Sequence, residues 1–290
     1  MKVGAVVLTM GNRPEELRAL LDSVAKQDGD RVEVVVVGNG SPLPALPEDV
    51  RTVELPENVG IPAGRNVGIE AFGPGGRDVD VLLFLDDDGL LPGTDTAELC
   101  REAFAADPEL GIISFRIADP DTGVTQRRHV PRLRAADPMR SSRVTTFLGG
   151  ANAVRTEVFE QVGGLPDDFF YAHEETDLAW RALDAGWMID YRSDMVLYHP
   201  TTAPSRHAVY HRMVARNRVW LARRNLPALL VPVYLGVWLL LTLARRPSRT
   251  ALRAWLGGFR EGWKTPCGPR RPMKWRTVWR LTRLGRPPVI

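Results

Sequence analysis

The chain has 290 residues, enough for one large α/β domain with an appendage or for two small domains. Its two cysteines, Cys100 and Cys267, lack metal-ligand spacing, which argues against a disulfide framework and fits a reducing compartment. Met1 and Lys2 run directly into an apolar stretch of about seven residues, which is too short for a signal peptide, so we expect the amino-terminal part to stay cytoplasmic.

Charge is distributed unevenly along the chain. Residues 201–290 hold 19 Lys and Arg and a single acid, Glu261, whereas residues 1–200 hold 19 basic and 34 acidic residues. A strongly basic tail on an acidic body predicts that the tail meets phosphate, either at a membrane surface or on nucleic acid.

Buried strands alternate with helices in the first 70 residues. The apolar runs 3–8, 32–37 and 50–55 predict strands. Residues 14–24 combine proline and acids in a first turn with one apolar face, which predicts a helix. The glycine-punctuated segment 57–69 leads into another helix. With the strand that follows, this alternation predicts a doubly wound, mostly parallel sheet.

Three aspartates follow the next strand. The apolar run 81–85 predicts a fully buried strand, and Asp86, Asp87 and Asp88 come directly after it, at the edge where α/β sheets bind ligands. Alternation along an extended segment places Asp86 and Asp88 on one side, where two carboxylates can share a divalent cation such as Mg2+ or Mn2+. The alternative is that these acids only close the strand in a turn.

The middle of the chain continues the same pattern. Residues 91–106 predict a helix and residues 111–117 a further strand. The polar, arginine-rich segment 118–143 is interpreted as a mobile active-site loop, with an inert surface excursion as the alternative. Gly149-Gly150, inside the apolar run 145–154, indicates close approach of the backbone to a ligand or to another strand.

A second acidic cluster follows an aromatic loop. Glu174, Glu175 and Asp177 stand at the start of a predicted helix, directly after Phe169-Phe170-Tyr171. Acids in a first helical turn complement the helix dipole, which is the structural alternative to a functional role. That alternative does not explain why the acids follow so aromatic a loop.

In this order, the motifs resemble family 2 glycosyltransferases of the GT-A fold, and in particular the bacterial rhamnosyl- and galactofuranosyltransferase branch. The resemblance spans about residues 3–200 and rests on residues 9–13, Asn39-Gly40-Ser41, residues 58–68, Asp86-Asp87-Asp88, Val162-Gly163-Gly164, residues 174–178 and His199. It implies an α/β nucleotide-sugar-binding catalytic domain at residues 1–204. A basic, partly apolar helical extension at residues 205–290 would follow and associate with a membrane.

The resemblance also implies roles for single residues. The expected donor-binding residues are Thr9, Asn12, Arg13, Asn39, Arg65, Asp86 and Asp87. The expected ligands of Mn2+ or Mg2+ are Asp86, Asp88 and His199, although His199 has the alternative of a strand-end histidine satisfied by backbone. Glu175 would be the general base, with Glu174 and Asp177 in the same catalytic motif. Two positions depart from the family, which more often has Asp at the positions of Glu175 and Gly38.

These roles together predict one reaction. A sugar would move from a nucleotide-diphosphate donor, UDP- or dTDP-linked, to a hydroxyl of a glycan or lipid-linked acceptor in cell-surface polysaccharide synthesis. The metal would neutralise the leaving diphosphate and a carboxylate would take the acceptor proton, in a single displacement that inverts the anomeric centre.

Two other functions are alternatives to this reaction. A nucleotidyltransferase would be expected to show a phosphate-gripping glycine-rich segment near the amino terminus, which residues 9–13 do not form. A noncatalytic protein that binds nucleotide sugar or a membrane surface is the second alternative, because the extra methylene of Glu175 displaces the carboxylate.

The basic tail contains a 19-residue stretch without charge, residues 226–244, after a predicted helix at 206–224. At about 1.5 Å per residue the stretch could just cross a hydrocarbon core of roughly 30 Å. Pro227 and Pro232 weaken its first half, and a span would export the basic remainder. We therefore favour a peripheral or monotopic helix in the cytoplasmic leaflet over a true span.

One face of a predicted helix near residue 280 carries Trp275, Val278, Trp279 and Thr282. A cationic amphipathic helix with tryptophan is typical of a membrane interface, and the alternative is a helix packed on the catalytic domain. The uncharged run beside so much basic charge fits lipid better than nucleic acid, so we expect the cell membrane, and no nucleic acid, as the partner of the tail.

Overall fold

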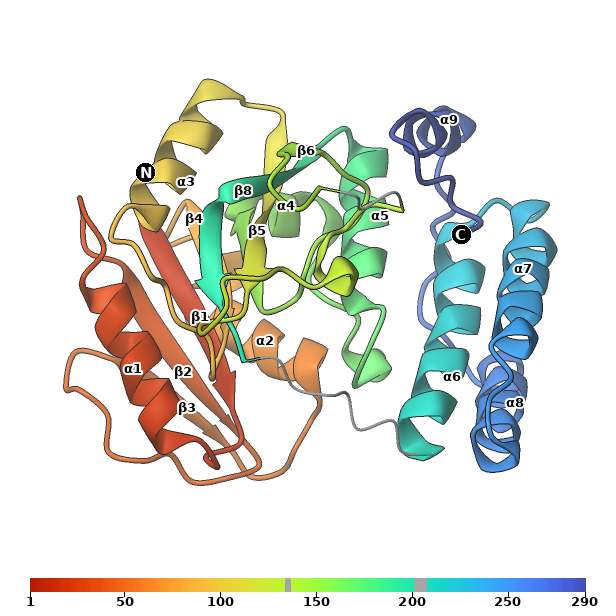
Figure 1. Cartoon of the computed structure of the whole chain (residues 1–290), viewed down its shortest axis with the longest axis horizontal. Helices are drawn as coiled ribbons and strands as arrows, with labels where there is room; N and C mark the ends of the chain where they lie inside the picture. The colour runs from red at the N-terminus through yellow and green to blue at the C-terminus, as the bar shows by residue number, and fades with distance from the viewer. Residues whose placement is uncertain (134–136, 201–207) are drawn as a thin grey trace.

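The computed structural model describes residues 1–133, 137–200 and 208–290 (Figure 1). The predicted boundary between residues 204 and 205 lies outside the described residues. The same holds for residues 134–136 of the predicted loop and for the first two residues of the helix predicted at 206–224.

An eight-stranded sheet forms the centre of the molecule, in the order β3-β2-β1-β4-β7-β5-β8-β6. Its strands are β1 (Val3–Thr9), β2 (Glu33–Asn39), β3 (Arg51–Leu55), β4 (Val81–Asp86), β5 (Leu110–Ala118), β6 (Ser142–Arg143), β7 (Ala151–Arg155) and β8 (Met188–Tyr198). Strand β7 is antiparallel to β4 and β5, and β6 is antiparallel to β8, while the other pairings are parallel. The predicted mostly parallel sheet is confirmed.

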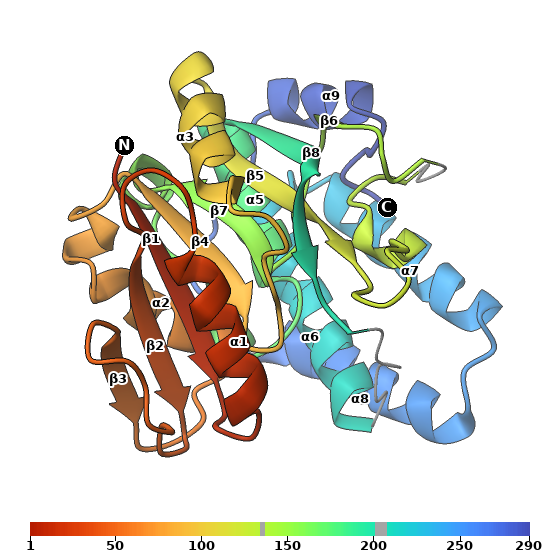
Figure 2. The same ribbon diagram turned by 60° about the vertical axis from the view of Figure 1, so that its left-hand side comes forward.

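Helices cover both faces of this sheet (Figures 1 and 2). They are α1 (Pro14–Ala25), α2 (Ile61–Glu70), α3 (Thr96–Ala106), α4 (Thr156–Val162) and α5 (Glu174–Ala185), with short 3-10 turns η1 (Pro74–Gly76), η2 (Arg127–His129) and η3 (Asp167–Phe169). Helices α1 and α3 pack on the face that carries Ala5 and Leu83, and α2, α4 and α5 pack on the face of Val6 and Phe84. This alternation buries each strand on both sides, as the continuous apolar runs predict.

Two segments differ from the expectation. The helix predicted from residue 91 begins only at Thr96, because Leu90 forms an isolated bridge with Tyr198 and Pro92 follows. The loop predicted at 118–143 contains η2 and the short strand β6, whose Arg143 pairs with Asp190 of β8.

The carboxyl-terminal part forms four helices, α6 (Ala208–Asn225), α7 (Leu230–Ala244), α8 (Arg249–Lys264) and α9 (Trp275–Arg283), of which the sequence analysis did not predict α8. They lie beyond α5 in Figure 1. Val219 and Trp220 of α6 belong to the same buried core as Phe169 and Leu178, so the extension packs directly on the α/β part. Within the described residues, no helix combines the length and the apolar character needed to span a membrane.

Helix α9 has two different faces. Thr277 is buried and its hydroxyl donates to Asp184 of α5 at 2.6 Å, and Leu281 beside it is fully buried. Trp275 and Trp279 are 49% and 64% exposed. Packing on the α/β part therefore occupies one face and leaves the tryptophans on the other.

Candidate active site

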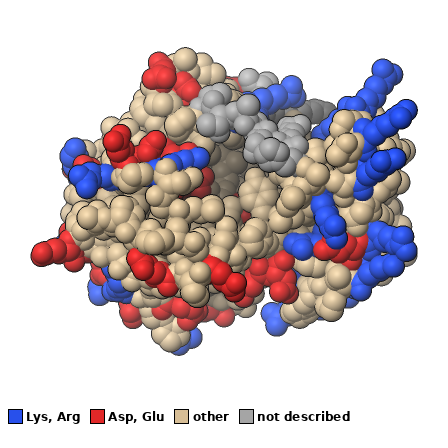
Figure 3. Space-filling view, turned by 90° about the horizontal axis from the view of Figure 1, so that it is seen from below, with Lys and Arg blue, Asp and Glu red and all other residues tan. Residues whose placement is uncertain are grey.

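A cavity of about 550 Å³ opens at the carboxyl ends of the central strands. Figure 3 looks onto this end of the sheet and shows a hollow with acidic side chains on its wall. The cavity brings together all nine residues predicted for donor and metal binding: Thr9, Asn12, Arg13, Asn39, Arg65, Asp86, Asp87, Asp88 and His199.

The three aspartates are divided between two arginines. Strand β4 ends at Asp86, whose Oδ1 accepts from Arg65 Nη2 at 3.1 Å. Arg13 Nη1 lies 2.7 Å from Asp88 Oδ2 and 3.2 Å from Asp87 Oδ1. The extended geometry that predicts Asp86 and Asp88 on one side stops at Asp86, because Asp87 and Asp88 form a turn. The prediction that strand alternation places Asp86 and Asp88 on one side is therefore corrected.

Asp87 lies beside the end of β1. It is buried, and the Thr9 hydroxyl donates to its Oδ2 at 2.7 Å. Burial raises the pKa of Asp87 above its ordinary value, against the opposing effects of Thr9 and Arg13. Thr9 and Arg13 thus hold this carboxylate in place at the end of β1.

Asp88 and His199 form the pair that suits a cation. His199 Nδ1 lies 2.9 Å from the Pro200 carbonyl, and Nε2 lies 3.1 Å from Asp88 Oδ1, an oxygen that makes no aligned hydrogen bond in the described structure. When Nδ1 carries the proton, two lone pairs face each other across this gap, so a proton or a cation must lie between them.

The protonation of this pair follows its geometry. Asp88 raises the pKa of His199, and the pKa of Asp88 is lowered because His199 and Arg13 outweigh the effect of burial. Carboxylate oxygen and imidazole nitrogen are suitable ligands for Mn2+. No third His, Cys, Asp or Glu completes a metal-binding cluster within the described residues.

Asn39 organises the loop after β2. Its Nδ2 donates to Asn58 Oδ1 at 3.0 Å and its Oδ1 accepts from Val59 N at 2.9 Å. Gly60, which follows, has φ +86° and packs so closely on Phe170 that an added Cβ would lie 2.5 Å from its carbonyl oxygen. Asn39 therefore lines the cavity and also fixes the start of α2, which carries Arg65.

The glycine pair before β7 makes room for two carboxylates. An added Cβ on Gly150 would lie 1.9 Å from Asp86 Cγ, and one on Gly149 would lie 2.1 Å from Glu175 Oε1. Asp86 belongs to the neighbouring strand β4, and its amide donates to the Gly150 carbonyl at 3.0 Å. The predicted close approach is confirmed, and its partners are the side chains of the two acidic motifs.

Glu174 and Glu175 begin α5 beside this glycine pair but do not line the 550 Å³ cavity. Glu175 and Arg65 border a second, small cavity together with Gly149. Burial raises the pKa of Glu175, against the opposing charge of Arg65. Burial and the neighbouring Glu175 raise the pKa of Glu174 well above its ordinary value. The pair therefore shares a proton more readily than two isolated glutamates.

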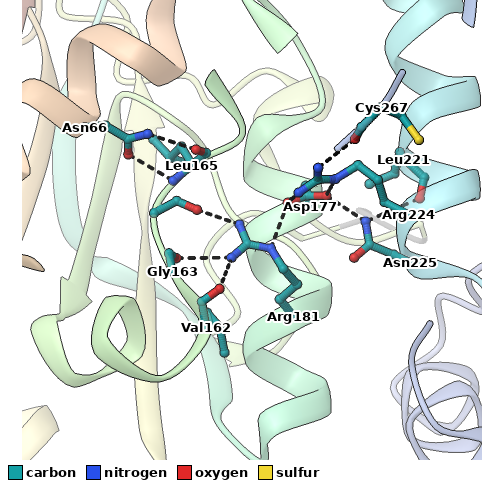
Figure 4. Close-up of polar contacts among 11 residues, drawn as sticks. Asn66, Val162, Gly163, Leu165, Asp177, Arg181, Leu221, Arg224, Asn225 and Cys267 are labelled. Carbon is teal, nitrogen blue, oxygen red and sulfur yellow. Dashed lines mark hydrogen bonds and ion pairs between the residues drawn. The ribbon is translucent and has the colours of Figure 1, made fainter. Parts of the chain in front are cut away.

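Asp177 takes a different position from the other two acids. It is fully buried, and its carboxylate accepts from Arg181 Nε at 2.8 Å, Arg224 Nε at 2.9 Å and Asn225 Nδ2 at 2.7 Å. Figure 4 shows these contacts running from α5 to α6. The structure thus places Asp177 away from the cavity, in the contact between the α/β part and the extension.

The extension also supplies part of the cavity wall, which sequence reasoning missed. Val209, Tyr210 and Met213 of α6 line the cavity, and Tyr210 packs edge-to-face on Tyr171 with ring centroids 6.0 Å apart. Only the aromatic character of the loop before α5 signalled this region in the sequence. The positions on α6 had no signal, because a packing partner distant in sequence decides which helical face meets the site.

The buried side chain of Asn217 holds the aromatic loop. Asn217 Nδ2 lies 2.8, 2.7 and 2.9 Å from the carbonyl oxygens of Phe169, Tyr171 and Ala172. Ala172 has φ +72° and Phe170 has φ +61°, values that residues with a Cβ rarely adopt. These contacts offset the strain of the loop, which places Tyr171 at the cavity.

The curated relatives are glycosyltransferases. Two sequences from Mycobacterium tuberculosis strains, each described as "Pre-mycofactocin glycosyltransferase", are 25% identical over 273 residues, which is 89% of this chain and 51% of the relative. The chain thus spans about half the length of the curated relatives it matches.

Solved structures share the fold at lower sequence identity. TarS 1–349 of S. aureus with UDP-GlcNAc is 16% identical over 90% of this chain and 80% of its own, with a TM-score of 0.62. GalNAc-T7 with UDP, GalNAc and Mn2+ is 14% identical over 92% and 52%, with a TM-score of 0.65. The mannosyltransferase PcManGT of Pyrobaculum calidifontis, with GDP-Man and Mn2+, is 18% identical over 98% and 73%, with a TM-score of 0.54.

The family itself follows from the sequence match. The family model described as "Glycosyl transferase family 2" matches residues 5–163, which is more than half of the chain and includes every strand of the sheet except β8 and the first two residues of β1. The matched segment contains the predicted donor residues and all three aspartates of the site. The chain belongs to glycosyl transferase family 2.

Proposed function

We propose that this chain is a metal-dependent, inverting glycosyltransferase that moves a sugar from a nucleotide-diphosphate donor to an acceptor hydroxyl. The observation that carries the proposal is the single cavity lined by Thr9, Asn39, Arg65, Asp88 and His199 at the carboxyl ends of the strands. Its volume of about 550 Å³ lies within the usual range of small-molecule sites, about 300–1,000 Å³.

The donor diphosphate meets both arginines of the cavity in this proposal. Arg13 and Arg65 each pair with an aspartate, and their remaining N–H groups can bind phosphate oxygens. Asp88 and His199 would hold Mn2+ or Mg2+, which would supply positive charge for the leaving diphosphate, while Asp86 stays paired with Arg65. UDP, UDP-GlcNAc and GDP-Man in the structures of similar fold support a nucleotide-sugar donor, and we expect UDP or dTDP.

Glu175 is the proposed general base. Its raised pKa moves it towards the working pH, where a carboxylate takes a proton more effectively. Glu174, buried and still harder to ionise, would remain protonated and keep the negative charge on Glu175. A base positioned beside Arg65, next to the donor cavity, fits a single displacement with inversion.

The catalytic domain of the proposal is residues 1–204, and residues 205–290 form the helical extension that borders the site. Exposed apolar side chains gather on the extension, including Leu229 (75%), Leu240 (67%) and Trp279 (64%). Basic side chains cover the same side of the molecule in Figure 3. We propose that this side lies on the anionic surface of the cell membrane, on its cytoplasmic face. A glycan or lipid-linked acceptor for cell-surface polysaccharide would be presented there.

A donor screen tests the proposal. Thermal unfolding is measured with UDP-, dTDP- and GDP-sugars, with and without Mn2+, on the wild type, Asp88→Ala and the matched control Asp22→Ala, whose acid is exposed on α1. We expect one nucleotide class to raise the unfolding temperature only with Mn2+, and Asp88→Ala to abolish that rise. Lack of any donor effect in folded wild-type protein would refute the donor site. Donor binding without sugar transfer to water or to lipid acceptors would favour a noncatalytic binding protein.

A further inference from the structure

A third cavity lies between the start of α5, the helices α6 and α7, and the last residues of the chain. It measures about 70 Å³, and Arg218, Arg286, His173 and Trp238 line it. Figure 1 shows the carboxyl terminus beside the upper end of α6. At about 10–15 Å³ for each water molecule, the space is enough for roughly five heavy atoms.

Both arginines of this cavity lack a carboxylate partner in the described structure. Arg218 is 8% exposed, and its Nη1 donates to the Tyr234 hydroxyl at 3.1 Å. Arg286 has no side-chain hydrogen bond or ion pair with a described residue. The segments 134–136 and 201–207, which the structure does not describe, contain no Asp or Glu. A buried guanidinium without an anion is costly, so the cavity favours a negatively charged occupant.

Two further polar atoms at this cavity lack partners among the described residues. They are Trp238 Nε1 and His173 Nε2, both buried. The Trp238 N–H can only donate, and its ring stacks under Arg218 with Cζ 3.5 Å from the ring centroid. Burial lowers the pKa of His173 well below its ordinary value, which favours the neutral ring, and when Nδ1 carries the ring proton Nε2 can accept a hydrogen bond from an O–H group. Among the described residues the cavity therefore presents one unpartnered indole N–H and one unpartnered ring nitrogen beside its two arginines.

We propose that this cavity is a binding site for a phosphate group, held by Arg218, Arg286 and Trp238 and separate from the donor cavity. Hydrogen phosphate and phosphate monoesters match the lining, since they offer several acceptor oxygens for the three donors. When singly protonated they also offer an O–H for His173 Nε2. The phosphate can be free in solution or the head of a lipid-linked molecule. Both sources offer the same phosphate oxygens to the two arginines and to Trp238.

The site lies close to the proposed general base. Thr176, which lines the cavity, is the residue after Glu175, and its hydroxyl is 3.5 Å from the Thr146 hydroxyl on the loop before β7. A phosphate held here would tie α5 to the extension one residue from Glu175. The proposal does not depend on the donor site, and the experiment separates the two.

Phosphate binding is tested by thermal unfolding and calorimetric titration with inorganic phosphate, against chloride at constant ionic strength. The variants are Arg286→Gln, Trp238→Phe, the donor-cavity variant Arg13→Gln, and the matched control Arg283→Gln, whose side chain is exposed on α9. Arg286→Gln removes no side-chain hydrogen bond or ion pair with a described residue, and Trp238→Phe keeps an aromatic ring, so both variants should fold.

We expect saturable stabilisation in the wild type, Arg13→Gln and Arg283→Gln. The dissociation constant should rise about tenfold or more in Arg286→Gln and rise also in Trp238→Phe, since each loses a donor to the anion. Unchanged binding in both variants, loss of binding in Arg13→Gln, or no binding to the wild type would overturn the proposal. Titration with geranyl phosphate distinguishes the sources: tighter binding than inorganic phosphate supports a lipid-borne phosphate, and equal binding supports a free one.

Discussion

Replacement of Asp177 by alanine should destabilise the whole protein through the contact between α5 and α6. The Asp177 carboxylate is fully buried and accepts hydrogen bonds of 2.7–2.9 Å from Arg181, Arg224 and Asn225. Its removal leaves two arginines without their shared anion, a change that typically costs about 3–5 kcal/mol in the free energy of unfolding. At roughly 2 °C per kcal/mol for a chain of this size, the unfolding temperature should fall by about 6–10 °C.

Denaturant unfolding followed by tryptophan fluorescence and circular dichroism measures this effect. The two signals should coincide, because the α6 residue Trp220 shares one core with Leu178 of α5. Glu102→Ala, at an exposed position of α3, is the control and should change stability by less than about 0.5 kcal/mol. A loss below about 1 kcal/mol in Asp177→Ala would refute the interpretation of this carboxylate as a buried anchor.

The pH dependence of the same variant gives an independent check. Arg181 and Arg224 outweigh the effect of burial and lower the pKa of Asp177 below its ordinary value of 3.8. A carboxyl group with a lowered folded-state pKa contributes stability above the unfolded-state value and loses it as the pH falls through the folded-state value. The difference between wild type and Asp177→Ala should therefore be constant near neutral pH and shrink below pH 3.8.

Three further changes test the site and the surface. Glu175→Gln should keep donor stabilisation but reduce the rate of sugar transfer by about 10²–10⁴, and a loss below tenfold would exclude Glu175 as the base. Gly150→Ala should abolish donor stabilisation, because its Cβ would collide with Asp86, whereas Gly257→Ala, in open space on α8, should not; equal behaviour of the two would contradict the close approach. Trp279→Ala should weaken sedimentation with anionic vesicles without changing the unfolding temperature, and unchanged sedimentation would argue against a membrane role for α9.

Much of the fold was predictable because its signals are local. The apolar runs predicted β1, β2, β3, β4 and β5, and Leu17, Leu20 and Val24 are buried on α1 as their spacing predicts. Residues that end adjacent parallel strands must lie at one edge of the sheet, so Thr9, Asn39 and the aspartates of 86–88 met at one cavity. The start of α3 was predicted too early, because the bridge between Leu90 and Tyr198 is a contact between segments distant in sequence.

The sequence by itself determined the alternation of strands and helices and the edge of the sheet at which the acidic motifs gather, because strand burial and strand ends are local properties of the chain. Only the tertiary structure decided the partners of each acid. Asp177 contacts Arg224 of the extension, whereas Glu175 lies beside Arg65, although both acids are in the first turn of α5. On a helix, side chains two positions apart point in different directions, and the element packed against each direction sets the surroundings of the charge.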